Sequence, residues 1–195
     1  MEPAYEKEVG KNHWWKHKVI KIYYDEDPCD PRDWDNFGTI VAWHRQYTFD
    51  EDGSKVHGTP DDFLEWAGEA QCVMLPVYLL DHSGLWISTS PQQFRAVDSA
   101  GWDWGQLGWI YVTQRDAIYQ LGIDEDEAWN EEHERQALEI LHEEIKTLNH
   151  YYTGDVLGYV IEDGSGKHID SCWGYYGFEP EKLAKEILAE YGYHE

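Results

Sequence analysis

The stretch VMLPVYLLDHSGLWIS, residues 73–88, contains two apolar segments separated by Asp-His-Ser-Gly at 81–84. Val, Ile, Tyr and Trp favour strands, and Asp, Ser and Gly have the conformational freedom and side-chain hydrogen bonds that tight turns require. A strand at 73–80 followed directly by a strand at 85–88 therefore predicts an antiparallel hairpin.

The same reasoning, extended outward, predicts a sheet built from several such strands. A second turn, residues 162–166 with the sequence EDGSG, separates two further strand-like segments. Strands rich in Val, Ile, Tyr and Trp are expected at 19–24, 38–43, 107–112, 156–161 and 168–173.

Helical patterns occupy the remaining regular segments. Thr113 is a predicted N-cap for a short helix ending at Leu121 before Gly122, and Pro180 suits the first position of a last helix running to Gly192. A long helix is expected from Asp126 to Leu148. The fold class is therefore α+β: a mainly antiparallel sheet with hairpins, packed against one long acidic helix and one or two shorter helices. The long helix would bury the stripe Ala137, Leu138, Leu141, Ile145 and Leu148.

Length and composition set the domain organisation and the compartment. A chain of 195 residues predicts a single domain over 1–195, in which the lysine-rich residues 1–18 form a flexible N-terminal arm. No apolar run approaches the ~18 residues that a membrane span requires, and the N-terminus lacks the apolar segment of a signal peptide. We therefore expect a cytoplasmic protein. Three cysteines without a CxxC spacing are expected to be reduced and buried.

The net charge is −24, from 39 acidic residues against 15 Lys and Arg, yet the chain also has 11 Trp and 14 Tyr. Such an aromatic content is typical of a folded chain rather than of an acidic disordered tail. Residues 24–35, 50–69 and 124–144 together carry −20 of this charge. Acidic surfaces repel nucleic acid and anionic membranes, so the expected partner is a basic protein. Solubility or adaptation to high salt is the alternative explanation.

The densest acid precedes and fills the start of the long helix. Asp124, Glu127, Glu131 and Glu134 recur at spacings of three and four, which places their carboxylates on one helical face. Steps of about 6 Å along a helix axis can imitate part of a phosphate track whose repeat is ~3.4 Å per strand. The alternative is a solvated face that the helix dipole favours. Glu132 and Glu139 widen this predicted partner-binding patch.

A second acidic segment, residues 25–36, has hard oxygen ligands at close spacing, as a calcium-binding loop requires. It lacks the Gly and the terminal Glu of an EF-hand, and its two prolines favour a polar loop instead. No cofactor is expected, with calcium as the alternative. The candidate ligands are Asp25, Asp27, Asp30, Asp33 and Asp35.

Catalytic motifs are scarce, since GxxxxGK[ST], GxGxxG, HExxH and CxxC are all absent. Adjacent Asp81, His82 and Ser83 cannot form a triad, because triads are assembled from distant positions. The enzymatic alternative is a small-ligand or hydrolytic pocket around His44, Asp81, His82, Asp103 and Asp170, in which Cys172 is the candidate nucleophile. A non-enzymatic function is preferred over this alternative.

Several blocks carry a resemblance to a known family. They are DWDNFGT at 33–39, LPVYLLDHSG at 75–84, STSP at 88–91, GQLGWIYV at 105–112, TGDVLGYVIED at 153–163 and DSCWG at 170–174. The chain resembles an uncharacterised family carried by phages, plasmids and other mobile elements. The resemblance implies an anti-defence context, in which small acidic proteins inhibit host restriction or CRISPR nucleases, some as DNA mimics.

The sequence therefore predicts an acidic, DNA-mimic-like inhibitor that binds the basic nucleic-acid groove of a host restriction or CRISPR nuclease. The alternatives left open are the small-ligand or hydrolytic pocket and a calcium-stabilised interaction module.

Overall fold

A computed structural model describes residues 2–10, 17–124 and 126–193. The chain divides into two compact units, and each has its own sheet. Unit 1 comprises the chain up to Cys29 and from Thr153 onward, and unit 2 comprises Asp30–Tyr152. Unit 2 is therefore inserted, in sequence, between the two parts of unit 1.

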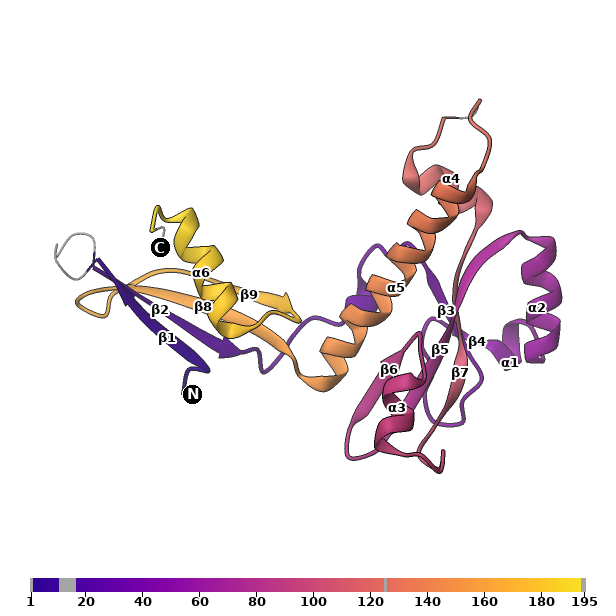
Figure 1. The fold of residues 1–195 in the computed structure, drawn as a ribbon, viewed down its shortest axis with the longest axis horizontal. Helices are drawn as coiled ribbons and strands as arrows, with labels where there is room; N and C mark the ends of the chain where they lie inside the picture. Colours follow the sequence, from indigo (N-terminus) through magenta and orange to yellow (C-terminus); the bar gives the residue numbers. More distant parts are fainter. Residues whose placement is uncertain (1, 11–16, 125, 194–195) are drawn as a thin grey trace. The chain divides into compact units, whose positions relative to one another are not determined.

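Unit 1 is a four-stranded antiparallel sheet covered on one face by a helix (Figure 1). Alternate residues of β2, such as Ile20 and Ile22, are buried against Leu183 and Ile187 of the helix. The strand order is β1-β2-β8-β9, with β1 at Tyr5–Val9, β2 at Lys18–Tyr24, β8 at Val156–Asp163 and β9 at His168–Tyr176, and the helix is α6, Pro180–Glu190.

Unit 2 contains a five-stranded sheet in which all pairs are antiparallel except β3 with β4. The β5–β6 hairpin turns at Asp81–Gly84, as residues 73–88 predict. The strand order is β4-β3-β7-β5-β6, with β3 at Thr39–Ala42, β4 at Glu51–Asp52, β5 at Cys72–Asp81, β6 at Leu85–Ser88 and β7 at Trp104–Thr113.

Helices cover both faces of this sheet (Figure 1). The long helix α5, Glu131–Thr153, buries its apolar stripe against one face, where Ile40 and Ile110 point. Phe63 and Ala67 of α2, Pro60–Glu69, pack against Val41 and Tyr111 on the opposite face. The remaining helices of unit 2 are η1 at Pro31–Asp33, α1 at Gly53–Val56, α3 at Gln92–Val97 and α4 at Gln114–Leu121.

The α+β class and the long helix are confirmed. Where the sequence predicts a single domain, the chain divides into two compact units. Separate apolar clusters fill the two units, because each sheet buries its own apolar face under its own helices. Within the predicted arm, Tyr5–Val9 forms a strand that pairs with β2, and Tyr5 and Val9 pack on the core of unit 1. Residues 1 and 11–16 of that predicted arm lie outside the described residues.

Candidate functional site

The hairpin turn of β5–β6 and the loop before β7 bring together three of the predicted pocket residues, Asp81, His82 and Asp103, and the loop after β3 adds His44 through Tyr47. The Nδ1 atom of His82 lies 2.7 Å from the Oδ2 atom of Asp103. The backbone of the same two segments is joined where Asp81 N–H donates to the carbonyl of Asp103 at 2.9 Å. The hydroxyl of Tyr47 donates to Asp81 at 2.9 Å, and the His44 ring stacks on Tyr47 with centroids 5.0 Å apart.

Asp98 holds the loop that carries Asp103. Its carboxylate accepts four backbone N–H groups, including those of Trp102 at 2.6 Å and Asp103 at 2.9 Å. These hydrogen bonds, the one from Asp103 first, lower the pKa of Asp98 below its ordinary value. The position of Asp103 beside His82 is thus set by main-chain contacts rather than by the His82 pair alone.

A small cavity opens beside His82. Its volume is about 280 Å³, and it is bounded by the hairpin and by α3. The surrounding side chains are mostly apolar, and one of them, Trp86, remains 45% exposed. The lining consists of Leu80, His82, Trp86, Gln93, Phe94 and Val97.

Asp170 and Cys172, also predicted for this pocket, belong to unit 1, whereas His44, Asp81, His82 and Asp103 belong to unit 2. Asp170 accepts hydrogen bonds from the hydroxyls of Tyr159 at 2.9 Å and Tyr191 at 2.7 Å, which lower its pKa. Cys172 is a free and exposed thiol, as is Cys29, so the expectation that all three cysteines are buried is wrong. Burial raises the pKa of the third, Cys72, to about 11.

The acidic row predicted along the long helix is not one helical face. The helix begins at Glu131 rather than at Asp126, because Asn130 accepts the N–H groups of Glu132 at 2.9 Å and His133 at 3.1 Å and so caps its first turn. Asp124 and Glu127 therefore lie in the preceding irregular segment. Glu127 is 3.2 Å from Nε2 of His133.

Two more of the predicted partner-binding acids are engaged within the helix. Glu132 and Glu139 both pair with Arg135, and the hydrogen bond from Arg135 lowers the pKa of Glu132. Asp124, Glu131 and Glu134 are exposed, and the described residues provide no ion pair or side-chain hydrogen bond for any of them. Three of the six predicted carboxylates are thus available to a partner.

A regular row of unengaged acids lies instead on α2, which the sequence analysis did not predict. Asp61, Glu65 and Glu69 recur at four-residue steps and are exposed, and we call them the α2 acidic row. Within the described part of the chain none of the three forms an ion pair or a side-chain hydrogen bond. Thr59, directly ahead of Pro60, forms a capping box with Asp62 at the start of this helix. This Thr-Pro-x-Asp pattern was the available sequence signal.

The acids of residues 24–35, read as calcium ligands, fall on both sides of the boundary between the units. Asp25 and Asp27 belong to unit 1, whereas Asp30, Asp33 and Asp35 belong to unit 2. Asp30 accepts the N–H of Arg32 at 2.8 Å and caps η1. Among the described residues no three His, Cys, Asp or Glu side chains are grouped as a metal site requires. Calcium binding stays a prediction.

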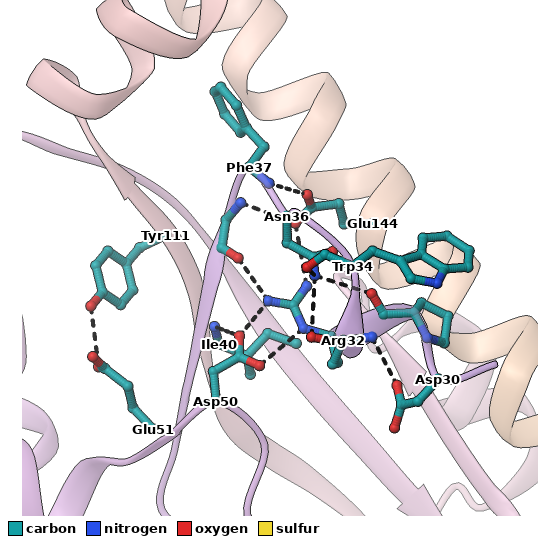
Figure 2. A network of polar contacts seen from close by, with 12 residues as sticks. Asp30, Arg32, Trp34, Asn36, Phe37, Ile40, Asp50, Glu51, Tyr111 and Glu144 are labelled. Carbon is teal, nitrogen blue, oxygen red and sulfur yellow. Dashed lines mark hydrogen bonds and ion pairs between the residues drawn. The ribbon is translucent and has the colours of Figure 1, made fainter.

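Arg32 from the same segment is the centre of a polar network that joins residues 30–38 to α5 and β3 (Figure 2). Its guanidinium contacts both oxygens of Asp50, the carbonyl of Gly38 at 2.7 Å and Glu144 at 3.4 Å. Glu144 in turn accepts the N–H groups of Phe37 at 2.5 Å and Gly38 at 3.1 Å. Burial raises the pKa of Glu144 despite these opposing hydrogen bonds. These acids support the fold rather than a partner.

Comparisons with known proteins provide no family. No family model, no curated protein and no solved structure matches the chain. Of the helices in the described ranges, none combines the length and the apolar character needed to cross a bilayer.

Proposed function

We propose that this protein is an acidic anti-defence inhibitor that acts in the host cytoplasm. It would occupy the basic nucleic-acid groove of a restriction or CRISPR nuclease. The proposal rests on the net charge of −24 and on the resemblance of the sequence blocks to a family of mobile elements. The observation that carries it is the α2 acidic row, in which three unengaged carboxylates are regularly spaced on one helix.

The spacing of the α2 acidic row suits a phosphate-binding groove. Four residues of helix advance about 6 Å along the axis, and two phosphate steps advance about 6.8 Å along one DNA strand. Asp61, Glu65 and Glu69 therefore approximate alternate phosphates over about 12 Å. Leu64, 39% exposed on the same helix, adds an apolar contact beside the acids.

We assign the contact to α2 rather than to α5, because several acids of α5 already have hydrogen-bond or ion-pair partners within the protein. Glu132 and Glu139 share Arg135, and Glu144 is engaged by backbone N–H groups. The two helices cover opposite faces of the sheet, so a single flat partner surface would meet one of them. The free acids before and on α5 supply the comparison for a test.

The test is inhibition of purified restriction and CRISPR nucleases by two charge-matched variants. One carries Asp61→Asn, Glu65→Gln and Glu69→Gln, and the other carries Asp124→Asn, Glu131→Gln and Glu134→Gln. Each variant removes three charges. Losing three exposed ion pairs with the partner, at about 0.5 kcal/mol each, corresponds to about tenfold weaker inhibition. We expect this loss for the α2 variant only, and weaker inhibition by the wild type at raised salt.

The outcomes separate the two parts of the proposal. A loss of inhibition in the α5 variant alone would support the inhibitor function but would place the contact surface on the acids before and on α5 instead of on α2. Equal inhibition by both variants and the wild type would contradict the proposal that these acids imitate phosphates. No inhibition of any nuclease by the wild type would contradict the proposed function.

A further inference from the structure

The cavity beside His82 has the volume of a site for two fused rings. It lies between the β5–β6 hairpin and α3, and its volume is about 280 Å³. An engineered protein cavity of about 150 Å³ holds one benzene molecule. A bicyclic aromatic is therefore the largest flat group that this volume accommodates comfortably.

The walls of the cavity leave apolar surface exposed to solvent. Phe94 is 1% exposed and forms the floor, but Trp86 is 45% exposed and Val97 is 66% exposed. Covering an aromatic ring and an aliphatic side chain with a flat apolar group is favourable, and the indole of Trp86 can stack on such a group. The lining thus favours an aromatic ligand over a highly polar one.

His82 and Gln93 are the polar residues that line this cavity, and His82 has a defined hydrogen-bond partner. In the neutral imidazole the proton on Nδ1 donates to Asp103 at 2.7 Å, which leaves Nε2 as a hydrogen-bond acceptor. No described residue forms a hydrogen bond with this Nε2 atom. Asp98 fixes the backbone of Asp103 through two of its four N–H contacts, at Trp102 and Asp103, and so supports the carboxylate that pairs with the imidazole.

We propose that this cavity binds a flat bicyclic aromatic carrying an N–H or O–H donor, the chemistry of an indole or of a purine base. The ring system stacks against Trp86 and covers Val97, and the donor meets Nε2 of His82. The site is independent of the α2 acidic row.

The test compares indole with benzofuran, which has the same shape but no N–H, by isothermal titration calorimetry on the full chain. One hydrogen bond corresponds to about fivefold tighter binding of indole to the wild type. His82→Ala should abolish this preference while retaining benzofuran binding. Trp86→Ala should weaken both ligands about tenfold or more. Trp102→Ala is the matched control, because Trp102 is 87% exposed on the neighbouring loop and does not line the cavity.

Circular dichroism of each variant first establishes that it is folded. Equal affinity of the wild type for indole and benzofuran would overturn the role of His82. Equal effects of the two Trp variants would overturn the location. Absence of binding by indole, benzofuran and adenine would overturn the site itself. Adenine titrated in parallel distinguishes a purine from an indole as the better fitting member of the class.

Discussion

Replacing Glu144 by Gln tests whether the Arg32 network holds residues 30–38 against α5. The two carboxylate oxygens accept different donors: Oε1 accepts the N–H of Phe37, and Oε2 accepts the N–H of Gly38 and the guanidinium of Arg32. Gln has a single acceptor oxygen, so its amide N–H₂ would face one of these donors. Arg32 retains Asp50 in the variant, which confines the damage to the contact with the helix.

The magnitude follows from burial and from the number of donors left without an acceptor. The side chain of Glu144 is 15% exposed, so a displaced backbone N–H finds little water, and one such donor costs about 1–3 kcal/mol. Burial raises the pKa of Glu144, so its charged form is disfavoured, and replacing it by a neutral side chain recovers part of this lost stability. We therefore expect a net loss of about 2 kcal/mol. For unit 2, with about 120 residues, this corresponds to a melting temperature lower by about 8 °C.

The assay is thermal melting followed by circular dichroism, with amide hydrogen exchange as the local readout. The matched control is Glu143→Gln on the same helix, where Glu143 is 62% exposed and pairs with Lys146 at 3.0 Å. That variant should lose no more than about 0.5 kcal/mol. In Glu144→Gln the amides of Phe37 and Gly38 should exchange faster. Equal melting temperatures for the two variants would refute the reasoning.

Three further predictions concern Gly108, Asp98 and the three cysteines. Gly108→Ala should destabilise the protein and lower its yield of folded chain, because a Cβ at Gly108 would lie 1.9 Å from the carbonyl oxygen of Val41; a melting temperature within 2 °C of the wild type, about 0.5 kcal/mol, would contradict this. Because the pKa of Asp98 is lowered in the folded state, its contribution to stability is complete above its ordinary pKa and is lost as the pH falls through its folded pKa. The amides of Ala100–Asp103 should therefore lose protection from hydrogen exchange in that acidic range, once the rates are corrected for intrinsic exchange. The variant Asp98→Asn should lack this transition. Iodoacetamide at pH 8 should label exposed Cys29 and Cys172 before Cys72, as peptide mass spectrometry would show, since the pKa of Cys72 is raised to about 11; equal rates would contradict its burial.

Local patterns predicted most of the strands and the helices α4, α5 and α6, but they missed β1, β4, α1, α2 and α3. The hairpin at 73–88 forms with its turn at Asp81–Gly84, and α4 begins with Thr113 accepting the N–H of Asp116 and ends at Gly122 with φ of 67°. These features depend on neighbouring residues, so sequence spacing contains the information. The strand at Tyr5–Val9 was missed because its three central residues, Glu6, Lys7 and Glu8, are all charged, which is typical of an exposed edge strand and gives no apolar alternation.

The division into two units was not predictable from local patterns. It depends on which strands pair, and β2 pairs with β8, more than 130 residues later in the chain. The same limit applies to the candidate site. The turn motif at Asp81 and the loop at Asp103 were each recognisable. Asp170 belongs to the other unit because its strand, β9, pairs with β8, and β8 pairs with the distant β2.

Acidic density along the sequence is a poor guide to the charge that a partner would meet. Asp50 and Glu144 hold Arg32, Asp62 caps α2, and Asp98 orders a loop, so these acids are committed to the fold. The segment with the most acid, residues 124–144, pairs Glu132 and Glu139 with Arg135 and buries most of Glu144. A carboxylate that already accepts N–H donors has less to gain from a cationic partner than one surrounded by water. A basic groove should therefore discriminate among the acids of this protein by their occupancy rather than by their number, which is why the charge-matched variants of α2 and α5 are expected to behave differently.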